Sequence, residues 1–457
     1  MVAKDVLVAR LRSVSHPFAI YISPGKCYYQ WAFHTVLLLL VGCRPVDPSL
    51  FRDSPAGRAV RTGPGYWAFI PNPLPPPLEW TQGLVTALSR ADRALGELAG
   101  IGRTMGNPHL LIVPFMRKEA VLSSAIEGTQ ASISDLYAFE AEQLSFLDRP
   151  ADVKEVHNYV RAMEQGLERL NSLPVSLRLF REIHGNLMQG VRGDQETPGE
   201  FRRSQNWIGP PGCTLEDATY VPPPSSEVGP ALAALEHYLH AEEDAPPLVR
   251  LALMHYQFEA IHPFSDGNGR TGRILNLLYL VEQQLLELPV LYLSRAIIRD
   301  KAEYYRQLHE VTTSGTWEPW ILYLVNAVNE TARWTTAKIL AMRNLLLETT
   351  QHVQRKAPSL YSRELVKLVF VQPYCRIANV VGAGLAKRPT ASEYLKELSD
   401  IGVLNEVKVG REKLFIHPKL MALPNGDFPQ RQRSTSASRT SAAVLEPRLK
   451  RSNRAQV

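Results

Sequence analysis

Cysteine is scarce in this chain of 457 residues, which holds four cysteines and no C-x-x-C pair. A disulfide framework needs paired cysteines in an oxidising compartment, and most structural zinc sites need closely spaced cysteine or histidine pairs. The composition therefore argues against both. Such sparse, unpaired cysteines are typical of a protein from a reducing cytoplasm.

Internal repeats of solenoid length and membrane-length apolar runs are also lacking. The apolar stretch from Trp31 to Cys43 has about the length of a signal-peptide core, and it ends in Leu-Val-Gly-Cys, which looks like a bacterial lipobox. About thirty residues precede it, however, and His34 interrupts it. We therefore interpret residues 1–50 as an extension outside the native fold, with a lipoprotein signal as the alternative, and expect no membrane association.

Taken as a whole, the chain before residue 428 carries no net charge. The sequence has 51 Lys and Arg against 45 Asp and Glu, and residues 428–457 hold seven of the basic residues and one of the acids. The rest of the chain therefore carries no net charge. Residues 425–457 are rich in Ser and Arg and are expected to form a disordered basic tail. The high isoelectric point is consequently no sign that the folded body binds nucleic acid.

Strand-like runs are few, whereas apolar residues recur at three- and four-residue spacing along most of the chain. This spacing predicts helices at roughly 82–100, 108–127, 132–144, 151–171, 176–191, 227–241, 246–261, 269–286, 296–311 and 318–350. The stretch from Asn206 to Pro224 is the exception, because two short extended pieces flank a Pro-Gly turn there. We expect a mainly α fold in which this stretch forms a β-hairpin flap.

A small basic domain follows these helices. Residues 356–420 carry eleven Lys or Arg against six acids. Three short helical patterns, at about 361–371, 376–385 and 389–400, precede an alternating hairpin around Gly410. Three helices followed by a two-stranded hairpin are the plan of a winged helix-turn-helix domain. The expected domains are the extension 1–50, an N-terminal helical region 51–150, a central core 151–350, a winged helix 356–420 and the tail 425–457.

The segment HPFSDGNGRTGR, from His262 to Arg273, contains the pattern G-x-G-x-x-G, but its context argues against dinucleotide binding. A Rossmann fingerprint needs a preceding strand and an acidic residue about twenty positions later. The residues before His262 are helical in period, and no suitably placed acid follows. The chain also has no Walker A motif.

The same segment does have the residues that bind an anion. Gly267 and Gly269 let backbone amides approach a ligand at the start of a helix that begins near Asn268, and the helix dipole favours negative charge there. Arg270 and Arg273 lie on the first turn and can hold further phosphate oxygens. The pattern therefore predicts a phosphate-binding loop.

Two further residues add chemistry to this loop. Asp266 is a hard oxygen ligand suited to Mg²⁺ that bridges phosphates. His262 can take a proton from a hydroxyl near neutral pH. Each residue alone is more often a helix-end histidine or a turn residue, and paired arginines on a helix usually form a solvated face. Their order within twelve residues is what indicates phosphoryl or nucleotidyl transfer.

This order resembles the signature H-P-F-x-[DE]-G-N-G-R-x-x-R of the Fic (filamentation induced by cAMP) family of protein adenylyltransferases, which matches completely from His262 to Arg273. The resemblance implies a nucleotidyltransferase in which His262 activates a Tyr, Thr or Ser hydroxyl of a target protein and AMP is transferred to it from ATP. It also implies that Asp266 binds Mg²⁺, that Phe264 anchors the loop, and that the phosphates are held by Gly267, Asn268, Gly269 and Arg270.

The stretch SSAIEG, Ser123 to Gly128, matches the inhibitory pattern [ST]-x-x-x-E-[GN] of that family. Ser123 and Glu127 are four residues apart and would share one face of a helix. The resemblance implies that Glu127 pairs with Arg273 and competes with the γ-phosphate, so that an N-terminal helix inhibits the enzyme; a solvent-facing acid at a helix end is the alternative. In some family members this Glu supports removal of AMP, which leaves that activity open here.

Two more stretches extend the resemblance over about residues 55–345. PGEFRRSQNWIG…ATYVPPP looks like the flap that positions a target, with an ordinary surface hairpin as the alternative. The segment from Lys301 looks like the one that closes over adenine, and Tyr304 is the expected contact, with a core-facing tyrosine as the alternative. Family members are often dimers, so monomer and homodimer both stay open.

The alternative function is a DNA-binding regulator in which the Fic-like core only senses a nucleotide. The basic balance of residues 356–420 favours contact with DNA. Glu393 and Glu397 on the expected recognition helix argue against it, as does the frequent use of winged helices for protein contacts. The complete motif favours the enzyme as the primary hypothesis.

Overall fold

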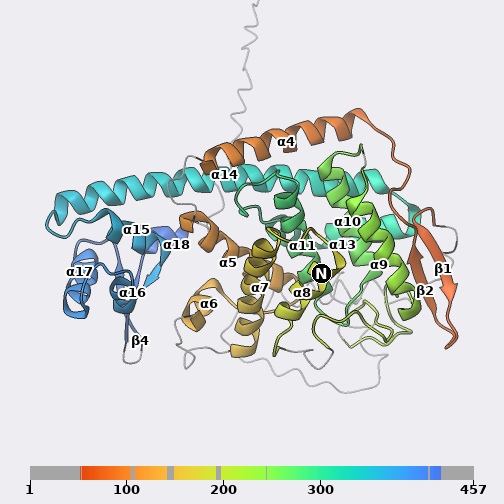
Figure 1. Cartoon of the computed structure of the whole chain (residues 1–457), viewed down its shortest axis with the longest axis horizontal. Coiled ribbons are helices and arrows are strands. Elements are labelled where there is room, and N and C mark those ends of the chain that lie inside the picture. Colours follow the sequence, from red (N-terminus) through yellow and green to blue (C-terminus); the bar gives the residue numbers. More distant parts are fainter. Residues whose placement is uncertain are drawn as a thin grey trace, which may run out of the picture. The chain divides into compact units, whose positions relative to one another are not determined.

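The computed structural model describes residue 52 and residues 54–103, 109–140, 149–191, 197–210, 212–242, 244–409 and 412–423. The chain forms two compact units, residues 1–339 and 340–457, and the division between them falls within the long helix α14, Trp317–Lys356 (Figure 1). The predicted extension 1–50 and tail 425–457 lie outside the described residues. No helix in the described part of the chain has both the length and the apolar character needed to cross a membrane.

Helices build the first unit, which confirms the mainly α prediction (Figure 1). In chain order these are α4 (Gln82–Arg103), α5 (His109–Ile126), α6 (Ile133–Glu140), α7 (Pro150–Arg169), α8 (Leu177–Leu187), α9 (Ser225–His240), α10 (Pro247–Ile261), α11 (Asn268–Glu282), α12 (Ser294–Arg299) and α13 (Lys301–Ser314). Helices α10 and α11 bury nearly every side chain, including Arg270, Arg273 and Asn276 of α11. They form the centre of the unit.

The single helix predicted at about 296–311 is wrong, because the chain forms α12 and α13 with a break at Asp300. The backbone of Asp300 leaves the helical region, with φ −139° and ψ 65°, and its carboxylate accepts a hydrogen bond from the Glu303 N–H at 3.2 Å. A side chain that satisfies a backbone donor in this way begins a new helix. Hydrophobic periodicity continues across such a cap and does not reveal it.

A hairpin near the start of the first unit was missed in the sequence. Strands β1 (Gly57–Arg61) and β2 (Trp67–Pro71) pair antiparallel in register from Gly57 opposite Pro71 to Arg61 opposite Trp67. The Phe69 N–H donates to the Val221 carbonyl at 2.9 Å, so β2 also holds the segment predicted as the flap. Five-residue strands beside a proline-rich stretch carry too little alternation to be distinguished from a loop.

The predicted flap, Asn206 to Pro224, is more irregular than the expected hairpin. Within its described residues the only pairing of strand type is one isolated bridge between Ile208 and Tyr220. Proline has no N–H to donate to a ladder, and the segment ends in three prolines in succession. The flap is therefore held by side chains and by β2 rather than by a ladder of its own.

The second unit contains the end of α14, α15 (Arg363–Val371), α16 (Ile377–Gly382), α17 (Arg388–Asp400), the strands β4 (Asn405–Val409) and β5 (Glu412–Ile416), and α18 (Pro418–Ala422). A short strand β3 (Tyr374–Cys375) adds to the other edge of β5. Helix α17 buries Ala391, Leu395 and Leu398 against the unit's core and leaves Lys387 and Arg388 exposed. The three helices and the hairpin thus follow the predicted order, while the winged-helix assignment and contact with DNA stay predictions.

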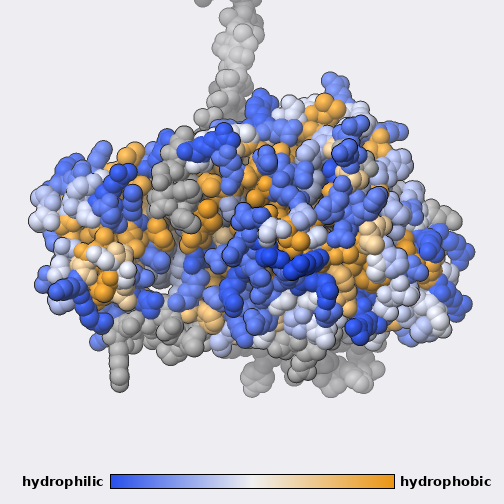
Figure 2. Space-filling view, viewed as in Figure 1, coloured by the Kyte–Doolittle hydropathy of each residue, from blue (hydrophilic) through white to orange (hydrophobic). Residues whose placement is uncertain are grey.

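The face shown in Figure 2 is covered mostly by hydrophilic side chains, with hydrophobic ones in smaller areas between them. Among the described residues, the large hydrophobic side chains that are well exposed are few: Trp80, Val85, Trp207, Tyr305, Leu347, Val381 and Val407. Two of them, Trp207 and Tyr305, lie in the flap and in the segment expected to close over adenine. Scattered exposed hydrophobic residues are ordinary, so their position matters here more than their number.

We expect Asp300→Ala to lower the free energy of unfolding by about 1 kcal/mol, because α13 loses the acceptor at its first turn. Asp300→Asn retains an acceptor oxygen and should stay close to the wild type. Urea unfolding followed by circular dichroism measures both. An equal loss in the two variants would show that the charge of Asp300, and not its role as a cap, stabilises this region.

Candidate functional site

The sequence motif lies on a sharp loop between the two central helices. Helix α10 ends where His262 takes a left-handed conformation, with φ 50° and ψ 60°, and Gly267 takes a second one, with φ 74°, just before α11 begins. A left-handed conformation is uncommon for a histidine, and the surrounding contacts must hold it in place. The loop of residues 262–267, which we call the motif loop, therefore depends on its neighbours.

Phe264 fixes the middle of the motif loop in the core. Its side chain is fully buried, and the ring of His184 stacks on it with centroids 3.7 Å apart and an interplanar angle of 4°. Phe201 and Phe258 pack against other parts of the same ring. The aromatic side chain thus anchors the loop between α8, α10 and the start of the flap segment.

Asn268 and Asn206 brace the loop through its backbone. The amide oxygen of Asn268 accepts from the Phe264 N–H at 2.8 Å, and its amide nitrogen donates to the Phe264 carbonyl at 2.7 Å. Asn206, from the flap, donates to the same carbonyl at 2.8 Å. The Asn268 side chain is therefore already satisfied within the loop, and the group that it leaves available to a ligand is its backbone N–H at the start of α11.

Arg202 stabilises the loop from the flap side. Its buried guanidinium donates to the carbonyls of His262 at 2.8 Å, Pro223 at 2.6 Å and Ser204 at 3.1 Å, and its backbone N–H donates to the Pro263 carbonyl at 2.9 Å. Burial lowers the pKa of Arg202 to about 10, which still leaves it charged at neutral pH. One side chain therefore ties the turn at His262 to both ends of the flap.

His262 is held as a neutral imidazole. Its Nδ1 lies 3.3 Å from the Glu259 carbonyl, and an N–H there would leave the Nε2 lone pair to accept a proton. Burial and, to a smaller extent, the positive charge of Arg202 lower the pKa of His262 to about 4. The Glu259 carbonyl and the carboxylates of Glu127 and Asp266 raise the pKa, but by less. A histidine that is unprotonated at neutral pH can act as a general base.

Asp266 lies at the open side of the loop, with 54% of its side chain exposed. Its backbone carbonyl accepts from His184 Nε2 at 3.0 Å, while His184 Nδ1 accepts from the Gly199 N–H at 2.9 Å. Burial lowers the pKa of His184 to about 4, consistent with one neutral tautomer that fixes this part of the loop. The Asp266 carboxylate itself also accepts from the Gly267 N–H at 2.6 Å.

A single open carboxylate suits Mg²⁺ that is shared with phosphates. Mg²⁺ usually takes one or two carboxylates, several waters and substrate oxygens rather than a cage made by the protein alone. Among the described residues, no group of three or more His, Cys, Asp or Glu side chains could hold a metal ion. The donor set therefore fits a metal that arrives with a nucleotide, and Asp266 is the residue that would hold it.

The two motif arginines are buried at the start of α11. Arg270 is 5% exposed; its Nη1 lies 3.3 Å from Glu155 Oε2, and its Nη2 lies 3.6 Å from Asp266 Oδ2 and 3.7 Å from Met188 Sδ. A buried guanidinium needs such partners, since an unpaired charge in the interior is costly. Glu155, on α7, was not singled out in the sequence.

Arg273 is bonded to the helix that carries the inhibitory pattern. Its Nε donates to Ser123 Oγ at 2.7 Å, and its Nη2 donates to the Ser123 carbonyl at 3.1 Å and to Glu127 Oε1 at 2.7 Å. Burial alone would raise the pKa of Glu127, but the positive charges of Arg273, Arg270 and Lys301 lower it. Glu127 is therefore a carboxylate facing the first turn of α11, where a methyl group added at Gly269 would overlap it.

Tyr304 lies in the core rather than at the surface of the site. It is 2% exposed, and its hydroxyl lies 2.9 Å from His255 Nε2, with the rings of Trp320 and Tyr323 nearby. This placement corresponds to the core-facing alternative for Tyr304. Its neighbour Tyr305 is 42% exposed, and the Lys301 ammonium lies 5.7 Å from its ring centroid.

Several contacts that shape the site carried no signal in the sequence. Arg202 lies in the stretch PGEFRRSQNWIG, but its sequence context does not distinguish it from a surface arginine. His184 and Glu155 lie on helices with ordinary amphipathic patterns. Lys301 donates to the Ile126 carbonyl at the end of α5, which helps to hold the helix that carries Glu127. These side chains bond mostly to backbone atoms or across long sequence separations, and no short motif records such contacts.

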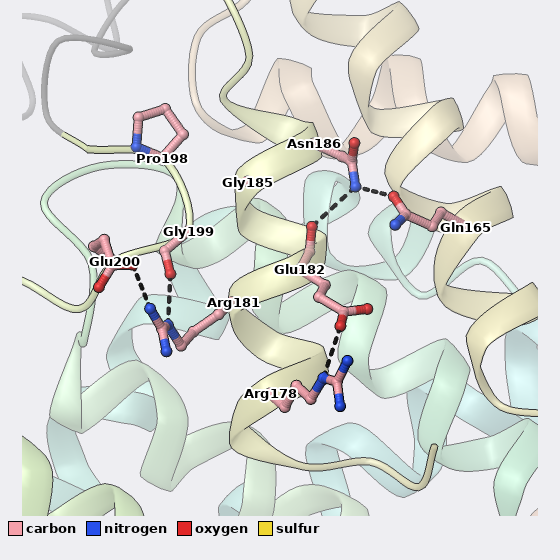
Figure 3. Close-up of a pocket in the computed structure, with 9 residues that line it drawn as sticks. All are labelled: Gln165, Arg178, Arg181, Glu182, Gly185, Asn186, Pro198, Gly199 and Glu200. Carbon is pink, nitrogen blue, oxygen red and sulfur yellow. Dashed lines mark hydrogen bonds and ion pairs between the residues drawn. The ribbon is translucent and has the colours of Figure 1, made fainter. Parts of the chain in front are cut away.

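A surface hollow of about 420 Å³ lies beside this site, between α8 and residues 198–200. Figure 3 shows Arg181 bonded to Gly199 and Glu200, and Arg178 bonded to Glu182. Because each arginine is paired with an acid of the same lining, the hollow has no surplus charge to attract a nucleotide. Its lining still bears on the motif loop, because Arg181 holds the carbonyl of Gly199 and the N–H of Gly199 donates to His184.

Two family models match the part of the chain that contains this site. The model described as "Fic/DOC family" matches residues 174–280, and the model "Fic/DOC family N-terminal" matches residues 85–168, so the chain belongs to the Fic/DOC family. More narrowly, residues 345–420 match the model "Protein adenylyltransferase SoFic-like, C-terminal domain".

Curated relatives agree at modest identity. The protein adenylyltransferase Fic of Drosophila grimshawi is 25% identical over 225 residues, which cover 45% of this chain and 43% of that protein. The protein of the same name from Drosophila willistoni is 24% identical over 256 residues, covering 54% and 47%. The chain thus spans less than half the length of these relatives.

Among solved structures, a Fic family protein from Desulfovibrio desulfuricans G20 is 19% identical and covers 75% of this chain and 98% of its own, with a TM-score of 0.49. A fragment of Fic-1 from C. elegans is 23% identical and covers 57% of this chain and 74% of its own, with a TM-score of 0.43.

We predict that the imidazole of His262 titrates near pH 4, well below the ordinary value of about 6.5. The unfolded chain would protonate this residue first, so its contribution makes the folded state less stable as the pH falls from about 6.5 to about 4. NMR of protein labelled at histidine Cε1 measures the midpoint, and the signal is assigned by its loss in His262→Ala. A midpoint between pH 6 and 7 would contradict the prediction.

Proposed function

We propose that this protein is an adenylyltransferase that moves AMP from ATP to a hydroxyl side chain of a target protein. The observation that carries the proposal is the juxtaposition of a neutral His262 with two buried arginines and the amide-rich start of α11. A base next to a phosphate-binding helix terminus is what nucleotidyl transfer to a hydroxyl requires. The relatives are named protein adenylyltransferases, which supports AMP as the transferred group and a protein as the acceptor.

The reaction follows from these groups. The target's hydroxyl oxygen attacks the α-phosphorus of ATP while His262 Nε2 takes its proton. The bond from the α-phosphorus to the bridging oxygen breaks, and pyrophosphate leaves with that oxygen. Backbone N–H groups of Asn268 and Gly269 and the guanidinium of Arg270 would hold the phosphates as charge develops, and the Gly267 N–H would join them on leaving the Asp266 carboxylate. Mg²⁺, when bound through Asp266, would supply neutralising charge to the phosphate oxygens.

We propose that Glu127 inhibits this reaction. Its carboxylate occupies Arg273 and lies over Gly269, the place and the charge that a γ-phosphate would take. Two anions cannot share one guanidinium without strong repulsion, so a nucleotide that leaves Glu127 in place must bind in another position. Moving Glu127 aside would free Arg273 for the γ-phosphate and align the α-phosphorus with the hydroxyl.

The flap is the proposed docking surface for the target. An extended target segment could pair with the strand-like edge around Ile208 and Tyr220, as in other cases of strand addition to an edge. Buried contacts from Arg202, Asn206 and β2 hold the flap beside His262. Target hydroxyls presented there would lie next to the base, and Tyr, Thr and Ser all carry one.

We predict that Glu127→Gly raises the rate of label transfer from α-labelled ATP at least about tenfold, the effect of removing a competing interaction of about 1.4 kcal/mol. Adding His262→Ala should reduce that rate by a factor of about 100 to 10,000, because the general base is lost. The assay measures labelled protein after incubation with Mg²⁺, both for the protein itself and for a cell lysate.

Glu127→Gln is the matched control, since it keeps the shape of the side chain and removes only the charge. It should also raise the rate, whereas a rise confined to Glu127→Gly would indicate that the backbone flexibility introduced at residue 127 is responsible. No label in any variant, with ATP still bound, would sink the transferase proposal. If the wild type releases AMP from a labelled target and Glu127→Gly does not, the protein also removes AMP, and this removal requires Glu127.

A further inference from the structure

Two acidic side chains of helix α7 accept hydrogen bonds from Thr129 and Gln130, which follow the proposed inhibitory residue Glu127. The Asp152 carboxylate accepts from the backbone N–H of Gln130 at 2.9 Å, and Glu155 Oε2 accepts from Thr129 Oγ1 at 2.9 Å. Asp152 and Glu155 are three residues apart and therefore lie on the same face of α7. Thr129 is 5% exposed and Glu155 is 4% exposed, so this is an interior contact.

The same Glu155 oxygen also holds the first motif arginine. Arg270 Nη1 lies 3.3 Å from Glu155 Oε2, and the two side chains are 5% and 6% exposed. A shared carboxylate thus links the hydroxyl of Thr129, two residues after Glu127, to a guanidinium of the motif. Charge-assisted hydrogen bonds of this kind are about twice as strong as neutral ones and are sensitive to the loss of either partner.

We propose that Glu155 is a positioning residue for Arg270 and that Thr129 couples the inhibitory segment to it. The segment of residues 123–130 is then connected to both motif arginines. Glu127 binds Arg273 directly, and Thr129 is linked to Arg270 through the shared carboxylate of Glu155. Only Gly128 lies between Glu127 and Thr129, so a displacement of the backbone of residues 127–129 acts on both connections. This inference rests on the proposed function for its effect on catalysis, but its contacts do not depend on it.

The proposal separates the roles of two side chains. Thr129 acts only on the inhibitory segment, so its removal should matter only while Glu127 is present. Glu155 orients Arg270, so its removal should affect nucleotide binding whether or not Glu127 is present. A merely structural contact would instead change stability in every background and leave binding and inhibition alone.

The variants to test are Thr129→Val, Thr129→Ser and Glu155→Gln, each alone and combined with Glu127→Gly. Thr129→Val keeps a similar shape and removes the hydroxyl donor, whereas Thr129→Ser keeps the donor and should behave as wild type. Glu164→Gln is the control for Glu155, since Glu164 is an exposed acid on the same helix. Thermal unfolding establishes that each variant is folded.

We expect Thr129→Val to raise label transfer about 3- to 10-fold, as the loss of one hydrogen bond of typical net strength would, and to add nothing in the Glu127→Gly background. Hydrogen–deuterium exchange of residues 123–130 should become faster in the same variant. We expect Glu155→Gln to weaken binding of ATP with Mg²⁺ at least threefold in both backgrounds, measured by calorimetry.

Two results would overturn the proposal. Unchanged exchange and transfer in Thr129→Val would show that Thr129 does not couple to the inhibitory segment. Unchanged or tighter ATP binding in Glu155→Gln would show that Glu155 does not position Arg270 for the nucleotide. Calorimetry and hydrogen–deuterium exchange do not require AMP transfer. The roles of Thr129 and Glu155 can therefore still be tested if Glu127→Gly transfers no label and the proposed function fails.

Discussion

The guanidinium of Arg273 is the group on which the arrangement of this site depends. Only 1% of its side chain is exposed, and a charge buried that deeply must be hydrogen-bonded. Ser123, near the end of α5, and Glu127, which directly follows that helix, provide those bonds, so the position of α5 against α11 follows from the need to satisfy Arg273. Any ligand that binds Arg273 must therefore replace the hydrogen bonds that Ser123 and Glu127 supply.

The motif loop, residues 262–267, also contains polar groups that must be hydrogen-bonded, in this case backbone carbonyls. A left-handed histidine and a tight turn expose backbone carbonyls that cannot all be satisfied within the loop. Arg202, Asn206 and Asn268 supply donors to these carbonyls, and His184 does the same at Asp266. Because the donors come from the flap, α8 and α11, the loop is rigid only when these elements are packed together.

The same packing determines the chemistry of His262. Burial disfavours the charged imidazolium, and the nearby Arg202 adds to this effect, so the residue stays neutral and able to accept a proton. Glu127 and Asp266 act in the opposite direction without reversing it. A change in the position of Glu127 would therefore alter both the hydrogen bonding of Arg273 and the electrostatic surroundings of His262.

Much of the fold and part of the site could be predicted from the sequence. Helical periodicity located the helices of the first unit to within a few residues at most ends, and the residues from His262 to Arg273 indicated an anion loop with a base. The break at Asp300 and the hairpin β1–β2 could not be predicted, because a cap and two five-residue strands leave almost no periodic signal. The core-facing position of Tyr304 could not be distinguished from an exposed one by its neighbours in the chain.

What the sequence determined by itself is local: a helix, a loop and a second helix, with base, acid, glycines and arginines in an order set by spacing within twelve residues. The tertiary structure alone decided which distant groups complete it. Ser123 and Glu127 meet Arg273 across about 150 residues of chain, and Glu155 meets Arg270 across 115. Such contacts depend on how helices pack and on donors to backbone carbonyls, which almost any polar side chain can provide, so residue types in the sequence do not mark them.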